Sequence, residues 1–137
     1  MPDTNPRAGA DEAAVVTKLS SRSVAETASL FTNLLASKGL KIFSVIDQSA
    51  EARLVGLELR ETILVIFGNP AGGTPVMVAS PLSALDLPLK VLVWSDEGQT
   101  KVSYTSPDEL AVRYSIRAEV VANLRGINAL TDALVAR

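Results

Sequence analysis

Residues that could bind or transform a ligand are concentrated in three short segments. The first runs from Gly68 to Pro75 and contains Asn69, Gly72, Gly73 and Thr74. Glycine reaches backbone conformations that are closed to other residues, and proline bars a regular strand. The segment is therefore predicted to be a loop that leads into a helix at Pro75, with Thr74 as the N-cap of that helix.

Such a loop could bind a phosphate or a carboxylate, because it would offer free backbone amides beside a helix N-terminus. The segment is not a Walker loop, since no Lys-Ser/Thr pair follows the glycines. The spacing of its glycines does not match G-x-G-x-x-G either. The alternative is a tight connection between a strand and a helix with no ligand, because glycine and proline punctuate turns of every kind.

The second segment is the corner that runs from Asp86 to Lys90 around Pro88. A lysine that is stripped of water loses its proton readily and can act as a base or a nucleophile, with a neighbouring aspartate as its partner. The alternative is an ion pair between Asp86 and Lys90 that fixes the turn, with the lysine stem over apolar surface.

The third segment is the turn that begins at Asp47. Asp47 could cap the stretch Ser49–Arg53, or it could stand as a carboxylate at the mouth of a pocket. Asp47 and Asp86 together could form an acid–base pair or hold a hard cation, but two carboxylates alone make no metal signature. A shared site requires that the turn after Ile46, the bend after Phe67 and the Asp86–Lys90 corner surround one hollow.

The composition excludes several classes of chemistry. The 137 residues include no Cys and no His, which removes disulfides, thiolate nucleophiles, imidazole catalysis and the usual zinc ligand sets. The formal net charge is −2 and aromatic residues make up 4%, so neither a basic stripe nor a stacking platform for nucleic acid is present. No metal and no cofactor are predicted.

The chain reads as one folded domain behind a short tail. Residues 1–12 are rich in Pro, Asp, Asn, Gly and Ala without apolar periodicity, which predicts a mobile tail and a single domain at 13–137. The longest apolar run, Ile63–Phe67, is far shorter than the roughly 20 residues that span a bilayer. A cytoplasmic protein without membrane contact is expected.

Periodicity and punctuation then predict the elements. The helix between Ser23 and Gly39 has a capping box at its start and a glycine at its end. Further helices are expected at 76–80 with a weak restart at 82–85, at 107–114, and as one last helix that carries Val120, Leu124, Ile127 and Leu134. Strands are predicted at 13–20, 40–46, 54–60, 62–67, 89–94 and 100–105.

This order predicts an α+β domain with a curved, mostly antiparallel sheet, packed on one face by the first and last helices. Phe43, Val45 and Trp94 are expected on the other face. A second copy of the chain is the simplest cover for such residues, so a homodimer is predicted.

Four blocks of sequence resemble the domain-of-unknown-function 302 family. They are FSVID at 43–47, VGLELR at 55–60, IFGNP with GTPVM at 66–77, and ALDLPLK with VW at 84–94. The resemblance covers roughly residues 15–111 and implies a small α+β fold with a curved antiparallel sheet, of the TATA-binding-protein-like class and often dimeric. The family has no established activity, so the resemblance implies no reaction.

One departure from the family pattern bears on chemistry. The family typically places a histidine directly after the aspartate that corresponds to Asp47, and this chain has Gln48 there. Glutamine can still donate and accept hydrogen bonds, but it cannot transfer protons as histidine does.

The sequence therefore supports three functional hypotheses. In the first, the domain binds a small polar or anionic ligand through Asn69, Gly72, Gly73 and Thr74, with Asp47, Asp86 and Lys90 as charged neighbours. In the second, the same cleft is an enzyme site with Lys90 as base or nucleophile and Asp47 or Asp86 as its partner. In the third, the domain serves only dimerisation.

Overall fold

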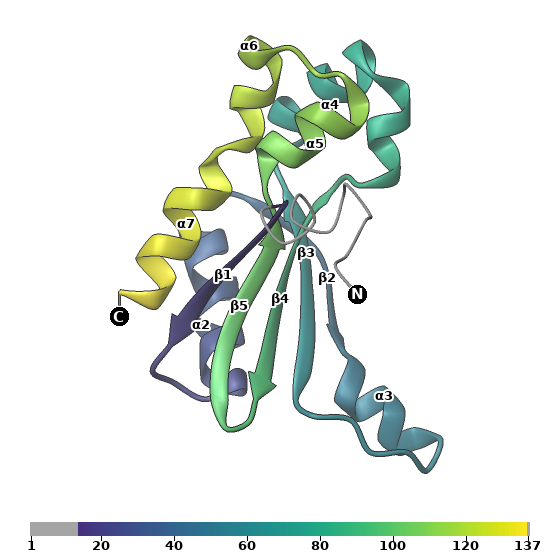
Figure 1. The fold of residues 1–137 in the computed structure, drawn as a ribbon. Coiled ribbons are helices and arrows are strands. Elements are labelled where there is room, and N and C mark those ends of the chain that lie inside the picture. The colour runs from purple at the N-terminus through teal and green to yellow at the C-terminus, as the bar shows by residue number, and fades with distance from the viewer. Residues whose placement is uncertain (1–13, 137) are drawn as a thin grey trace, which may run out of the picture.

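A five-stranded antiparallel sheet forms the centre of the molecule (Figure 1). The computed structural model describes residues 14–136, and the tail predicted at 1–12 lies outside them. The strands follow the order β1-β5-β4-β3-β2, with every neighbouring pair antiparallel. Their bounds are β1 Val15–Ser20, β2 Lys41–Asp47, β3 Thr62–Gly68, β4 Leu89–Asp96 and β5 Gln99–Thr105. The predicted α+β class and antiparallel sheet are confirmed.

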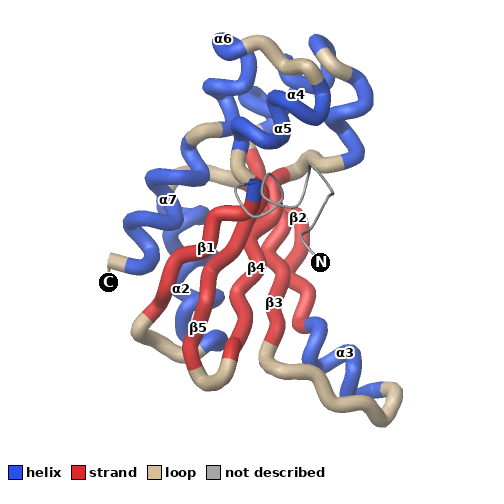
Figure 2. The backbone as a smooth tube through the Cα atoms, viewed as in Figure 1, coloured by secondary structure: helices blue, strands red, loops and turns tan. Residues whose placement is uncertain are grey.

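Helices gather behind the sheet and at one of its ends (Figure 2). The α-helices of the described residues are α2 Val24–Ser37, α3 Gln48–Leu54, α4 Pro70–Ala79, α5 Pro107–Tyr114, α6 Ala118–Val121 and α7 Gly126–Val135. Two 3₁₀ segments join them, η1 Pro81–Leu85 and η2 Ala122–Leu124. None of the helices in the described part of the chain is long and apolar enough to cross a membrane.

The main core lies between the sheet and the pair of helices α2 and α7, as predicted. Phe31 and Leu35 of α2 are completely buried against Val65 and Phe67 of β3. The rings of Phe31 and Phe67 meet edge to face, with centroids 5.3 Å apart, an arrangement that suits the charge distribution of aromatic rings.

Helix α2 forms where local signals placed it. The Ser23 side chain accepts a hydrogen bond from the amide of Glu26 at 3.1 Å, which satisfies one of the free donors of the first turn. Gly39 follows the helix with a φ of +71°, a conformation that residues with a Cβ rarely adopt.

A second core forms a helical cap at the end of the sheet where β3 ends and β4 begins (Figure 1). Helices α4, α5 and α6 with η2 bury its five members, which are Val76, Leu110, Ile116, Val121 and Leu124. Leu89, the first residue of β4, packs against both cores. Leu89 therefore lies at the boundary between the cap core and the sheet core.

The strand predicted at 54–60 is wrong. No strand forms at 54–60: α3 runs to Leu54, and Gly56 then turns the chain with a φ of +77°. Val55 and Leu57 are exposed, at 72% and 64%. The structure places β2 and β4 on the two sides of β3, so this segment has no place beside β3 in the sheet.

The last helix is not continuous either. It divides into α6, η2 and α7 between Val121 and Gly126. Val121 and Leu124 pack in the cap core, whereas Ile127 and Leu134 pack in the sheet core. The break therefore lies where the chain passes from the cap core to the sheet core.

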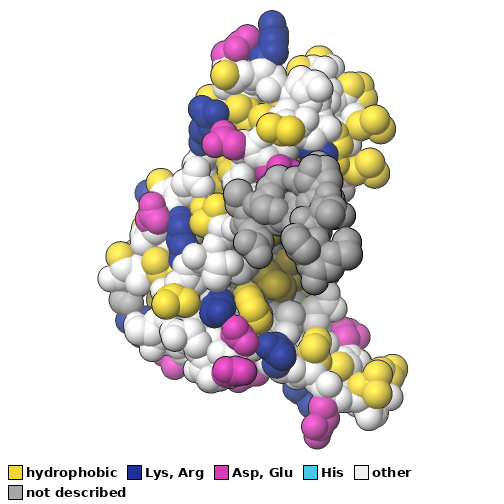
Figure 3. Space-filling view, in the orientation of Figure 1, with side chains coloured by type: hydrophobic (Ala, Val, Ile, Leu, Met, Phe, Trp, Pro, Cys, Tyr) yellow, Lys and Arg dark blue, Asp and Glu magenta, His cyan; other side chains and the backbone are white. Residues whose placement is uncertain are grey.

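The second face of the sheet carries none of the helices of the described chain, and Figure 3 shows apolar side chains on this side of the molecule. A register shift between Ile42 and Ser44 changes which residues of β2 lie on this face. It pairs Val45 with the buried Val65, and directly paired residues lie on the same face of a sheet. The prediction that Val45 shares the second face with Trp94 is therefore wrong.

Candidate ligand-binding site

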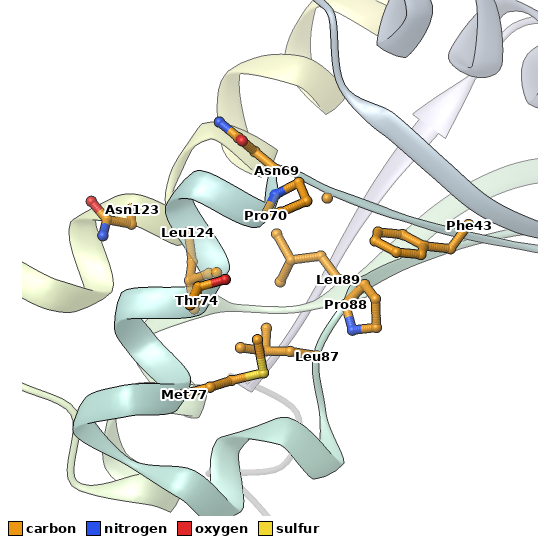
Figure 4. Close-up of a pocket in the computed structure, with 12 residues that line it drawn as sticks. Phe43, Asn69, Pro70, Thr74, Met77, Leu87, Pro88, Leu89, Asn123 and Leu124 are labelled. Carbon is orange, nitrogen blue, oxygen red and sulfur yellow. The ribbon is translucent and has the colours of Figure 1, made fainter.

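A hollow of about 230 Å³ opens between the end of the sheet and the helical cap (Figure 4). It lies where β3 ends, where β4 begins and where the chain passes from η1 into β4. Its walls are mostly apolar, and its lining residues are Phe43, Gly68, Asn69, Pro70, Gly73, Thr74, Met77, Leu87, Pro88, Leu89, Asn123 and Leu124. None of these residues carries a charge.

Helix α4 supplies one side of the hollow, and it begins five residues earlier than predicted. Asn69 is its N-cap and accepts a hydrogen bond from the amide of Ala71 at 3.0 Å. Pro70 occupies the first turn, where a proline costs no hydrogen bond. Thr74 is therefore inside a helix and not a cap, and the predicted loop from Gly68 to Pro75 is wrong.

This correction removes the anion site that the loop suggested. The amides of Gly72 and Gly73 donate to the carbonyl oxygen of Asn69 at 2.9 and 2.8 Å. Because these donors are already used within the first turn, they are not free to hold a phosphate or a carboxylate. Gly72 instead allows close packing, since a Cβ on it would lie 3.4 Å from the backbone oxygen of Asn123.

The polar groups around the hollow differ in where they point. In Figure 4 the Thr74 hydroxyl points toward the side of Leu89, whereas the amides of Asn69 and Asn123 point away. The Asn69 oxygen is occupied as the α4 cap. The hydroxyl of Thr74 is thus the polar group of the described lining that is best placed to meet a ligand.

Asp47 does not belong to this site. The register pairs Lys41 with Gly68 and Asp47 with Ile63, so Asp47 lies at the opposite end of β2, about 20 Å from the hollow at the usual rise of a strand. It caps α3 by accepting from the Ser49 hydroxyl at 2.6 Å and the Ala50 amide at 2.9 Å. These hydrogen bonds, that from Ser49 first, lower the pKa of Asp47.

The other two predicted segments do meet at the hollow, but the corner contributes Leu87, Pro88 and Leu89 to its lining, and Asp86 and Lys90 do not line it. Phe67 pairs with Leu89 across β3 and β4, which brings the start of α4 beside the Asp86–Lys90 corner. Asp86 and Lys90 line a separate small cavity of about 30 Å³ on the side toward β5 and α5. Leu89 contributes to both spaces.

Asp86 finds partners that the sequence did not suggest. It accepts hydrogen bonds from the hydroxyl of Tyr114 and from the guanidinium of Arg113, the latter at 2.9 Å. The hydrogen bond from Tyr114, followed by that from Arg113, lowers the pKa of Asp86, and the same contact raises the pKa of Tyr114. The cluster ties η1 to α5, so Asp86 has a structural role in the cap.

Lys90 is exposed on the face of the sheet that the helices leave open. No ion pair with Asp86 forms within 4.0 Å in the described chain, where the carboxylate of Asp86 pairs with Arg113. The enzyme hypothesis required a lysine that is stripped of water, and the exposed Lys90 does not meet that condition. Among the described residues, no group of three or more His, Cys, Asp or Glu is arranged to hold a metal ion.

Sequence reasoning missed most of the lining because it looked for polar groups. The apolar wall consists of Phe43, Pro70, Met77, Leu87, Pro88, Leu89 and Leu124. From the sequence, Phe43 and Leu89 are predicted to be strand residues, and Met77 is predicted to lie in a helix. Only the pairing of strands and the position of η2 bring them together.

The fold and the hollow define a class of protein: a small α+β domain with a one-sided antiparallel sheet and an apolar space beneath a helical cap. The profile of the family "Domain of unknown function DUF302" matches residues 16–134. The chain therefore belongs to the DUF302 family, whose description assigns it no function.

A solved structure shares this fold. It is that of an uncharacterized conserved protein, DUF302, from Bacillus stearothermophilus. It superposes with a TM-score of 0.76 at 18% identity, over 90% of this chain and 96% of that one. At this identity the similarity concerns the fold alone.

Three curated proteins of Brucella also resemble the chain, each 38% identical over 112 residues. They are named Fluoride-specific ion channel FluC 1 in Brucella suis and Brucella abortus, and FluC 2 in Brucella melitensis. The match covers 81% of this chain but only 44% of the Brucella suis protein and 42% of the other two. The chain thus spans less than half the length of these relatives.

Proposed function

We propose that this domain binds a small, largely apolar molecule that carries one hydrogen-bonding group. The observation that supports the proposal is the composition of the hollow: of the twelve lining residues, none is charged and seven are large apolar residues or prolines. Sites for small organic molecules combine such apolar walls with a few placed polar groups. The Thr74 hydroxyl is the group suited to a ligand hydroxyl or carbonyl.

This proposal modifies the one drawn from sequence, which favoured a polar or anionic ligand. Asn69, Gly73 and Thr74 remain at the site, but as parts of a helix whose first amides are satisfied. Burial of apolar surface supplies the affinity instead, at about 25 cal/mol for each Å² removed from water.

Octan-1-ol tests the proposal because it has an apolar chain and a single hydroxyl. In a titration followed by amide NMR shifts, we expect Gly68, Gly73 and Thr74 to move together with one dissociation constant. The indole of Trp94 serves as the internal reference, since Trp94 pairs with Thr62 at the far end of β3. Sodium fluoride is a useful second probe, because the Brucella relatives are named for that ion.

Gly73→Leu is the variant that blocks the site. Gly73 lines the hollow, and a Cβ there meets nothing within 4 Å, so a larger side chain can be added without displacing backbone. We expect the octanol shifts to disappear in this variant while the fold is retained. Gly126→Leu is the matched control, because Gly126 is an exposed glycine at the start of α7 with equally open surroundings. Octanol shifts that survive Gly73→Leu would contradict the proposal.

Dimerisation is the second candidate, and exposed side chains on the open face of the sheet favour it. Leu19 is 57% exposed and Val15 is 48% exposed on β1. Leu92 and Trp94 are half-buried on β4. A second copy laid on this face would remove all four from water. A cytoplasmic location remains a prediction from the sequence.

A further inference from the structure

Lys41 carries its charge beside Phe43, a residue that lines the hollow. Lys41 pairs with Gly68, which lines the hollow. Its Nζ lies 5.0 Å from the centroid of the Phe43 ring, which forms one wall. Both residues are exposed, Phe43 at 45%. The positive charge is thus adjacent to the apolar space without being part of its lining.

The charge on Lys41 has no anionic partner within the described residues. Two other lysines also lie beside aromatic rings but differ from Lys41 in this respect. Lys18 lies 5.3 Å from the Tyr104 ring and Lys101 lies 5.4 Å from the Trp94 ring. Each of these two also forms an ion pair with an aspartate, with N–O distances of 2.8 and 2.7 Å. Aspartates thus neutralise the charges of Lys18 and Lys101, whereas Lys41 contacts the Phe43 ring and no carboxylate among the described residues.

The irregular pairing of β2 and β3 accounts for the position of the ring. The register shifts between Ile42 and Ser44, which leaves Phe43 as the extra residue of a bulge. A bulge re-aims a side chain that regular pairing would hold in line with its neighbours. In Figure 4 the ring of Phe43 points to the hollow from the side of β2. The bulge therefore places the Phe43 ring in the wall of the hollow, and Lys41 lies beside that ring.

We infer that the preferred ligand is an amphipathic organic anion, with its apolar body in the hollow and its carboxylate at Lys41. The inference rests on the proposed binding function and adds the ligand class to it. An apolar wall beside a cation that has no anionic partner among the described residues favours a molecule that has an uncharged chain and one charged end. Thr74, on the α4 side, meets the ligand body or its second polar atom.

Octanoate and octan-1-ol separate the charge from the chain, because they share an apolar tail of similar length. We expect the wild-type protein to bind octanoate about two- to five-fold more tightly than octan-1-ol, the range of a partly exposed ion pair. In Lys41→Met the octanoate affinity should decrease by the same factor, while octan-1-ol binding is unchanged. The preference should also shrink as salt is added, since exposed charges are screened.

Lys90→Met is the matched control. It removes the same charge from the exposed lysine of β4, which the sequence alone suggested as the site cation. We expect it to leave the octanoate preference intact. A preference that is absent from the wild type, that survives Lys41→Met or that is lost in Lys90→Met overturns the inference while octan-1-ol binding remains. If neither compound shifts the Gly73 amide, or if Gly73→Leu changes neither, the proposed function itself is wrong.

Discussion

The carboxylate of Asp86 stabilises the fold, although its position in the sequence suggested a catalytic or binding role. The sequence placed it beside Lys90, but its hydrogen bonds come from Tyr114 and Arg113 of α5. Such bonds stabilise the charged form of a carboxylate, and they hold the pKa of Asp86 below its ordinary value. Asp47 and Asp96 have lowered pKa values for similar reasons, because Ser49 and Lys101 donate to them.

The lowered pKa of Asp86 predicts an acid-dependent stability. A carboxylate with a depressed pKa in the folded state contributes its stability above the unfolded value, near 3.8, and loses it as the pH decreases through the folded value. We expect Asp86→Asn to lower the free energy of unfolding by about 1–2 kcal/mol at pH 7. The difference from wild type should disappear below the folded pKa.

Urea unfolding at a series of pH values measures this difference. Tyr114→Phe is the informative companion, because it removes the donor that contributes most to the lowered pKa. A difference in the free energy of unfolding between wild type and Asp86→Asn that is constant from pH 7 to pH 2 would show that the carboxylate does not act through its charge.

Among the elements, α4 is where sequence and structure differ most instructively. Two signals for a helix start stand five residues apart, Asn69-Pro70 and Thr74-Pro75, and each combines a capping side chain with a proline. The intervening Gly72 and Gly73 favoured the later start. In the structure the earlier one is used, because Gly72 packs against Asn123 and Val76 is completely buried in the cap core.

The elements that could be predicted are those whose signals are local. Ser23, Glu26 and Gly39 fix α2 at both ends within the chain itself. The hairpin from β4 to β5 follows from Glu97-Gly98, both at positive φ. In contrast, the break near Gly126 depends on two cores that only the complete fold creates, and so does the lining of the hollow. Of the predicted site residues, Asn69, Gly73 and Thr74 line it.

Two glycine substitutions test the α4 assignment. Gly73 lies inside a helix with open space where a Cβ would be, so Gly73→Ala should raise the free energy of unfolding by about 0.5–1 kcal/mol. Gly39→Ala should lower it by a similar amount, because Gly39 has a φ of +71°. Denaturant midpoints at unchanged slope measure both. A destabilised Gly73→Ala would argue for the loop instead of the helix.

At the scale of the whole molecule, the fold consists of two cores with one shared wall. Leu89 contacts the sheet core on one side and the cap core on the other, and it also lines the hollow. The candidate site is therefore a gap at the junction of the two packed units. Such junctions are common positions for ligand sites, because neither unit alone fills the space.

The open face of the sheet predicts self-association of the whole chain. Sedimentation velocity of the wild type should show a dimer, and Leu19→Asp should yield a monomer, because a charge would be buried within the apolar contact. Val112→Asp is the control, since Val112 is 73% exposed and belongs to α5 of the helical cap, not to a strand of the sheet. A wild-type chain that sediments as a monomer at every concentration would remove this second candidate.

The exposed segment that follows α3 offers a practical opening. Leu54, Val55 and Leu57 all lie largely in solvent, and α3 projects from the end of the sheet away from the helical cap (Figure 1). Exposed turns of this kind accept inserted sequences with little effect on the packed body. A fluorescent reporter spliced in at Gly56 would leave Lys41, Phe43 and the cap untouched, and would give the chain a handle for locating its ligand and its partners in living cells.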